Sequence, residues 1–105
     1  MTVVTGSGII AFVITSFKSE EAAKIWAGVV SRKLPQDIQR SALRKLEILN
    51  AATDVTDLRM PPGNRLEAFK DDRLGQHSIR INDQWRLCFV WRDGNAQDVD
   101  MVNYH

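Results

Sequence analysis

Cysteine is almost absent from this sequence of 105 residues, since Cys88 is the only one. A single cysteine excludes an internal disulfide and is typical of a reducing compartment, so we expect a cytoplasmic protein. Long apolar runs are also lacking: residues 9–14 are too few to cross a bilayer, and no basic segment precedes them, so no membrane association is expected. Repeats and linkers are absent as well, and the length predicts one domain, residues 1–105.

A strong net charge is lacking too. The formal charge is +1, so the overall balance does not indicate a nucleic-acid partner. The charges are unevenly distributed, however: residues 32–45 carry five basic side chains and one acid, whereas residues 93–105 carry three aspartates and no Lys or Arg. Both a nucleic-acid-binding face and an ordinary solvated helix surface are compatible with this asymmetry.

Two helices are predicted in the first half of the chain. Ser19 followed by two glutamates is typical of a helix start, and this helix is expected to end near Gly28. Pro35 marks a second start. Beyond it, four apolar residues recur at helical spacing and predict a buried stripe: Ile38, Ala42, Leu46 and Leu49.

The other elements are predicted to be strands. Residues 9–17 are rich in Ile, Val, Phe and Thr, which favours a first strand before the helices. Further strands follow a connector at 54–64, and they are expected at 65–69, 77–81, 85–92 and 97–102. This order predicts an α+β fold, with the N-terminal strand and two helices packed on one face of a mostly antiparallel sheet.

The alternation of apolar residues predicts how the strands pair. Keeping the apolar side chains on one face requires Ile79 opposite Leu87, which leaves three residues in the first hairpin loop. The same reasoning predicts a three-residue loop at 93–95 rather than a two-residue Asp-Gly turn, with Phe89 opposite Val99.

This register places two like charges side by side. Arg80 lies directly opposite Arg86, on the face turned away from the helices, where their repulsion calls for an anion nearby. Asp98 or Asp100 on the next strand could supply it, and so could a phosphate of a ligand. Tyr104 has the same parity and would lie at the rim of this surface.

The chain ends in Tyr104-His105, directly after a strand-like alternation. Such a strand would hold a phenol and an imidazole in place, and both groups can move protons near neutral pH. The alternative is a frayed surface tail, as chain ends often are.

Several segments, in order and at the right spacing, resemble the HigB toxins of the RelE superfamily. They are residues 16–18, 34–53, 65–70, 75–86 and 102–105. The resemblance implies a RelE-like α+β toxin that cuts mRNA in the ribosome by attack of a 2′-hydroxyl on the adjacent phosphate. It implies no metal and no cofactor, and its partners would be the ribosome, mRNA and a HigA-like helix-turn-helix antitoxin.

The resemblance also implies roles for single residues. Those matching catalytic positions of the family, for proton transfer and for stabilising the transition-state charge, are His105, Tyr104, Arg86 and Lys70. Arg73 and Arg80 match expected RNA contacts.

Two positions depart from the family pattern. The family commonly ends in Asp-Tyr-His, whereas this chain has Asn103, which we place with the RNA-binding residues. Some members carry a histidine where Glu67 stands; Glu67 is a candidate base or a solvent-exposed side chain. A catalytically weakened homologue that mainly binds the antitoxin and acts as a co-repressor is therefore an alternative. His77 has the parity of the apolar face and is predicted to be a packed histidine.

Overall fold

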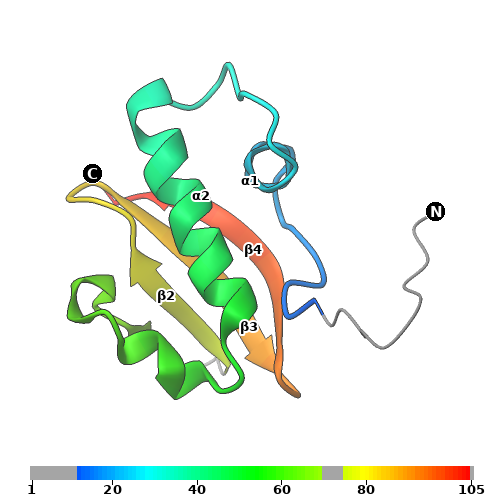
Figure 1. Ribbon diagram of the computed structural model, residues 1–105, viewed down its shortest axis with the longest axis vertical. Helices are drawn as coiled ribbons and strands as arrows, with labels where there is room; N and C mark the ends of the chain where they lie inside the picture. The colour runs from blue at the N-terminus through cyan, green and yellow to red at the C-terminus, as the bar shows by residue number, and fades with distance from the viewer. Residues whose placement is uncertain (1–11, 70–74, 105) are drawn as a thin grey trace.

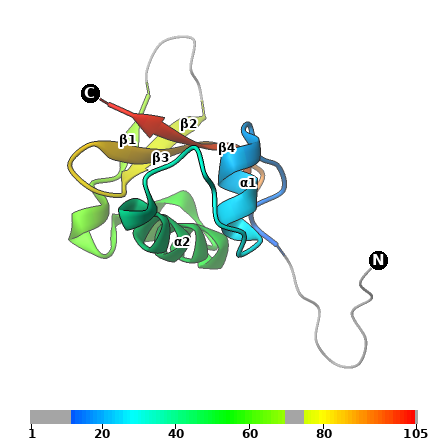
Figure 2. The same cartoon turned by 90° about the horizontal axis from the view of Figure 1, so that it is seen from above.

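The computed structural model describes residues 12–69 and 75–104. Two helices and two short 3-10 turns precede a four-stranded antiparallel sheet with the strand order β1-β2-β3-β4. The elements are α1 (Glu20–Trp26), α2 (Gln36–Ala51), η1 (Val55–Arg59), η2 (Pro62–Asn64), β1 (Glu67–Ala68), β2 (Gln76–Arg80), β3 (Trp85–Arg92) and β4 (Asn95–Asn103). Both helices lie on the same side of the sheet, as the two views show (Figures 1 and 2), so the predicted α+β class is confirmed. Within these ranges no helix is both long and apolar enough to span a membrane.

Helix α1 begins and ends where the sequence predicts. The Ser19 hydroxyl accepts a hydrogen bond from the Ala22 amide at 3.2 Å and so caps the first turn. At the other end Gly28 has a φ of 81°, and the next amide, that of Val29, donates to the Lys24 carbonyl at 2.8 Å. This is a Schellman ending, which favours glycine because the position is left-handed.

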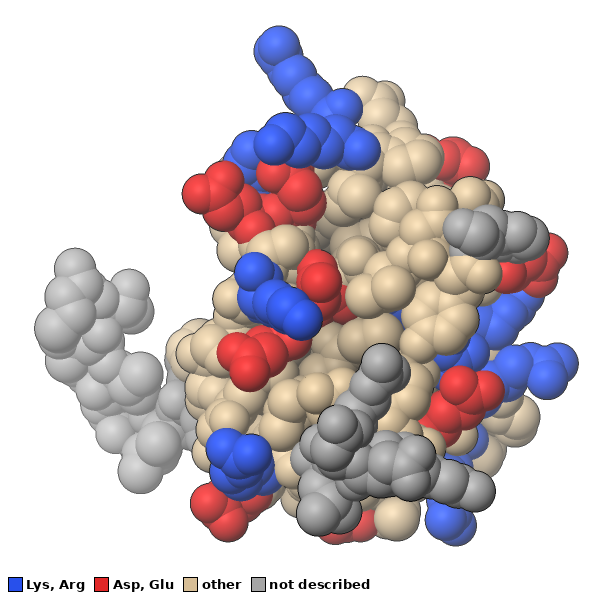
Figure 3. Space-filling view, turned by 180° about the vertical axis from the view of Figure 1, so that it is seen from behind, with Lys and Arg blue, Asp and Glu red and all other residues tan. Residues whose placement is uncertain are grey.

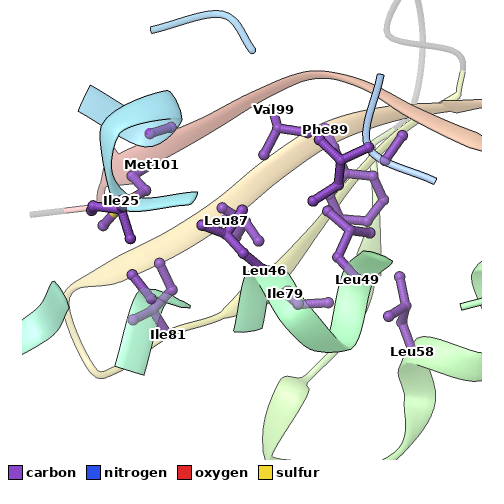
Figure 4. Packing of buried hydrophobic residues seen from close by; sticks show 14 of the residues in the cluster. Ile25, Leu46, Leu49, Leu58, Ile79, Ile81, Leu87, Phe89, Val99 and Met101 are labelled. Carbon is purple, nitrogen blue, oxygen red and sulfur yellow. The ribbon is translucent and has the colours of Figure 1, made fainter. Parts of the chain in front are cut away.

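Helix α2 supplies the central part of the core. Its predicted apolar stripe is buried, and Leu46 and Leu49 are completely shielded from solvent. They pack toward the sheet residues Ile79, Leu87 and Phe89 (Figure 4). Burying a side chain of this size contributes about 1.5–3 kcal/mol to folding, so this layer fixes the sheet under the helices.

The predicted N-terminal strand is only partly present. Residues 12–17 form no regular strand; instead, two isolated parallel bridges join Ile14 to Ala96 and Phe17 to Val99 on β4. The Asn50 side-chain oxygen of α2 accepts hydrogen bonds from the amides of residues 13 and 14 at 3.0 and 3.1 Å. Part of the segment's hydrogen bonding therefore goes to a helix rather than to the sheet. Residues 9–11 lie outside the described ranges.

The predicted register between β2 and β3 is confirmed. Ile79 pairs with Leu87, and Arg80 pairs with Arg86. His77 stacks on Phe89 with the ring centroids 6.0 Å apart, in agreement with the prediction of a packed histidine.

The predicted loop between β3 and β4 is wrong. Arg92 pairs with Asn95, so the connection is a two-residue turn formed by Asp93 and Gly94. Their φ angles are 53° and 79°, and two consecutive positive values define the type I′ turn that suits a hairpin's twist.

A β-bulge reconciles this tight turn with the apolar pattern. The register shifts by one residue between Cys88 and Val90, so that Asp98 and Val99 together face Phe89. Asp98 has a φ of 52°, the left-handed conformation of the first residue in a G1-type bulge. The predicted one-to-one pairing of Phe89 with Val99 is therefore wrong. On the side of the bulge away from the turn, the strands pair in the register predicted from the sequence. Leu87 therefore faces Met101 as predicted.

Replacing Gly94 with alanine is expected to destabilise the fold by about 1–2 kcal/mol, because an L-residue is strained at its positive φ. Beyond the two adjacent residues, no atom lies within 4 Å of the added Cβ, so the effect would be conformational. Gly63→Ala is the matched control, since it also meets open space but has no positive φ. Thermal unfolding of the two variants measures the difference; equal stabilities would contradict the assigned turn.

Candidate functional site

The face of the sheet turned away from the helices, seen in Figure 3, has mostly uncharged side chains at its centre and charged ones toward its edges. The guanidinium of Arg86 on β3 belongs to this face. Its Nε donates to the Ser78 hydroxyl at 2.8 Å, and its Nη2 donates to the carbonyls of Arg65 at 2.6 Å and Ser78 at 3.3 Å. Arg86 is consequently only 9% exposed.

The expectation of an anion beside the two arginines is met, but by carboxylates other than the two aspartates proposed from the sequence. Arg80 forms an ion pair with Asp83 in the hairpin loop, whereas Arg86 extends the other way, toward β1. Neither aspartate proposed from the sequence, Asp98 or Asp100, forms an ion pair with these arginines. The register places the two Cα atoms opposite each other, but the side chains diverge and find separate partners.

Two further predicted residues surround the Arg86 guanidinium. A carboxylate oxygen of Glu67 on β1 lies 3.8 Å from Nη2, and the Glu67 side chain is 57% exposed. The Tyr104 ring covers another side, with its centroid 5.9 Å from Arg86 Cζ, which is cation–π distance. Arg86 thus connects the edge strand to the end of β4.

The backbone and the side chain of Tyr104 have separate environments. Its amide donates to the Gln84 carbonyl at 2.7 Å, so the chain is hydrogen-bonded at this point. Its hydroxyl lies 3.9 Å from Cys88 Sγ. Desolvation raises the pKa of the phenol, and the neighbouring Cys88 thiol raises it further. The phenol is therefore protonated at neutral pH and can donate a proton or a hydrogen bond.

A pocket of about 500 Å³ adjoins this tyrosine on the same face. Its lining includes Lys18, Gln76, Cys88, Asp98, Asp100 and Tyr104. Burial raises the pKa of the Cys88 thiol, so this cysteine is neutral and a poor nucleophile. Over the described ranges, no group of three or more His, Cys, Asp or Glu side chains is arranged to hold a metal ion.

The structure thus brings Arg86, Glu67 and Tyr104 together. Asn103 precedes Tyr104 at the end of β4; it is exposed and pairs with Trp85. Lys70, Arg73 and His105 lie outside the described residues, so their places in the site stay predictions.

Sequence reasoning missed Ser78 and the pocket residue Lys18. Ser78 shares the parity of Arg80 and Arg86, so its place on this face could have been recognised. Its role as a buried acceptor for a guanidinium could not, because alternation gives the face of a residue and not its burial or its hydrogen-bond partner. Nothing in the local pattern around Lys18 signals a pocket.

The match to a family of known proteins covers residues 15–105, most of the chain. The matching description is a RelE-like toxin of a type II toxin–antitoxin system. Within this class the family is HigB, and the chain belongs to the HigB-like toxins.

Individual relatives agree with this assignment. The chain is 51% identical over 65 residues to Toxin HigB-1 of Vibrio cholerae, covering 62% of this chain and 68% of that protein. It is 31% identical over 93 residues to Endoribonuclease HigB of Proteus vulgaris, covering 88% of this chain and 99% of that protein. An uncharacterized protein of Haemophilus influenzae is 31% identical over 72 residues, or 69% of this chain and 71% of that protein.

Proposed function

We propose that this protein is an endoribonuclease that inhibits translation by cutting mRNA on the ribosome, as the toxin of a type II pair. The observation that carries the proposal is the Arg86 guanidinium, held by three hydrogen bonds beneath Tyr104 in a HigB-like chain. A cation fixed in this way needs no reorganisation when negative charge develops on a phosphate. In this proposal the protein acts in the cytoplasm, where ribosomes and mRNA meet.

The proposed reaction is an internal transesterification. A base removes the proton of the 2′-hydroxyl, the 2′-oxygen forms a bond to phosphorus, and the bond from phosphorus to the 5′-oxygen breaks. The products are a 2′,3′-cyclic phosphate and a 5′-hydroxyl, and neither a metal nor a cofactor takes part. We assign the base to His105 or Glu67, and the proton of the leaving oxygen to Tyr104, whose raised pKa keeps the phenol protonated.

The cations would share the charge of the pentacoordinate phosphorus. Arg86 would donate hydrogen bonds to the phosphoryl oxygens, and Lys70 is proposed to contact the scissile phosphate. Arg73, Arg80 and Asn103 are proposed to position the RNA. In this scheme an incoming phosphate would compete with the exposed Glu67 carboxylate for the Arg86 guanidinium.

A weaker, mainly regulatory homologue is the second candidate. Glu67 partly neutralises Arg86, and Asn103 lacks the carboxylate common in the family. Such a protein would still bind a HigA-like helix-turn-helix antitoxin, which is the partner we propose in either case.

Inducible expression of the chain, with and without the neighbouring gene, is expected to arrest growth only when the neighbour is absent. Mapping mRNA 5′ ends should then show new ends inside translated reading frames. A reporter whose start codon is removed serves as the control, because ribosome-dependent cleavage should spare it. Cleavage of this reporter would contradict ribosome dependence, and arrest without new ends would contradict nuclease activity.

A further inference from the structure

The pocket of about 500 Å³ beside Tyr104 has the size of a small-ligand site, which is about 300–1,000 Å³. It lies on the sheet face shown in Figure 3, because Gln76 of β2, Cys88 of β3 and Asp100 of β4 share that face and line it. We call it the Tyr104 pocket. Among its lining residues, the proposed reaction uses only Tyr104 itself, so the rest of the pocket is available to a part of the substrate away from the reacting atoms.

The β-bulge of β4 adds a second carboxylate to this pocket. Asp98, the bulged residue, lines the pocket together with Asp100. The Asp98 amide donates to the Ser16 hydroxyl at 2.9 Å, which fixes the backbone at the bulge. The Met101 amide donates to Asp100 Oδ1 at 2.9 Å, which orients that carboxylate and leaves Oδ2 for a ligand. Bulges often redirect a side chain beside a functional site, and this one directs a carboxylate into the Tyr104 pocket.

The pocket also carries a positive charge, because Lys18 lines it. Burial has the largest effect on the pKa of the Cys88 thiol and raises it; Asp100 raises it further and Lys18 lowers it, so both charges lie near this residue. Within residues 12–69 and 75–104, Lys18, Asp98 and Asp100 form no ion pair with one another or with any other side chain. The amine and the carboxylates therefore surround one hollow without neutralising each other by direct contact.

This mixture of charges favours a neutral ligand with both donors and an acceptor. A phosphate would be repelled by the two carboxylates, and a cationic side chain would be repelled by Lys18. A carboxylate only accepts hydrogen bonds and an ammonium group only donates them, so a neutral ring with both kinds of group can satisfy all three residues. The rings of Phe69 and Tyr104 also line the pocket, and unpaired bases of RNA stack on such rings.

We propose that the Tyr104 pocket binds a guanine base of the mRNA, from one of the two nucleotides that the scissile phosphate joins. The Watson–Crick edge of guanine carries two adjacent donors, N1–H and the N2 amino group, beside the acceptor O6. The donors would face the carboxylates of Asp98 and Asp100, and O6 would face Lys18. Adenine, cytosine and uracil each lack the two adjacent donors. The inference rests on the proposed function, since it names the base beside the bond that the protein would break.

Cleavage on programmed ribosomes tests this preference, with mRNAs that differ only in the bases on either side of the cut bond. Guanine should be cut about 10-fold or more faster than adenine, as expected for one two-point contact to a base. Inosine, which lacks the N2 amino group, should give an intermediate rate. Asp100→Asn should reduce the preference to about 2-fold or less, because the amide replaces one acceptor with a donor. The matched control is Asp93→Asn, since Asp93 is exposed in the β3–β4 turn and does not line the pocket.

Binding to the free protein gives a readout that needs no cleavage. In an NMR titration, guanosine monophosphate should bind about 10-fold more tightly than adenosine monophosphate and shift the amide signals of Cys88 and Asp100. The two nucleotides carry the same phosphate, so the difference reports the base. Lys18→Met should weaken the binding of guanosine monophosphate and leave that of adenosine monophosphate nearly unchanged, because only guanine presents O6 to the amine.

The outcomes separate the base site from the nuclease. Equal cleavage at guanine and adenine, or a wild-type preference in Asp100→Asn, overturns the guanine site while mRNA cleavage still stands. If the protein cuts no mRNA, tighter binding of guanosine monophosphate supports the site although the nuclease fails, and equal binding of the two nucleotides overturns both. Displacement of guanosine monophosphate by free arginine at equal concentration would also overturn the proposal and assign the pocket to a basic peptide.

Discussion

Arg86→Ala is expected to abolish mRNA cleavage and to destabilise the fold by about 2–4 kcal/mol. The loss of stability follows from the buried contacts, since the change leaves the Ser78 hydroxyl and the carbonyls of Ser78 and Arg65 without their donor. The sequence alone predicts an exposed, repelled arginine whose removal would cost about 1 kcal/mol or less. The structure reverses that expectation.

The matched control is Arg80→Ala. Its ion pair with Asp83 is largely exposed, so its removal should change stability by less than about 1 kcal/mol. Urea unfolding of both variants measures stability. Activity is measured as single-turnover cleavage on programmed ribosomes, at a temperature where each variant is folded. An Arg86→Ala protein with wild-type stability would contradict the buried network; one with wild-type cleavage would contradict the catalytic assignment.

Replacing His105 with alanine is expected to slow cleavage by roughly 10²-fold or more, because it removes a group that transfers protons near neutral pH. Tyr104→Phe should cost about as much if the phenol protonates the leaving oxygen, and less if it only orients the substrate. Phenylalanine keeps a ring over Arg86, so this change isolates the hydroxyl. Neither change should alter folding, since the last described ladder pair joins Trp85 to Asn103.

Asn103→Asp serves as the gain-of-function counterpart. It introduces the carboxylate that the resemblance to HigB toxins implies at this position, and it should raise the rate if that charge tunes Tyr104 and His105. The readout is again single-turnover cleavage, with thermal unfolding as the check on folding. Wild-type rates from both His105→Ala and Tyr104→Phe would return the chain end to the frayed-tail interpretation and leave Lys70, Glu67 and Arg86 as the candidate catalytic set.

The sequence by itself determined the elements whose signals are local. The Ser19 cap, the Gly28 ending and the apolar stripe of α2 depend on residues within one or two turns, so each could be predicted. The register of β2 against β3 also followed, because a slip of one residue would turn every apolar side chain of a strand to the wrong face.

Only the tertiary structure decided the rest. A single bulge at Asp98 changes parity within β4, and the alternating pattern cannot distinguish a long loop from a tight turn followed by a bulge. The alternation along β3 likewise places Arg86 on the sheet face turned away from the helices. It cannot show whether other residues cover the side chain there. The guanidinium contacts the Arg65 carbonyl and the Tyr104 ring, both distant in sequence, and Arg86 is buried although its place in the strand suggests exposure.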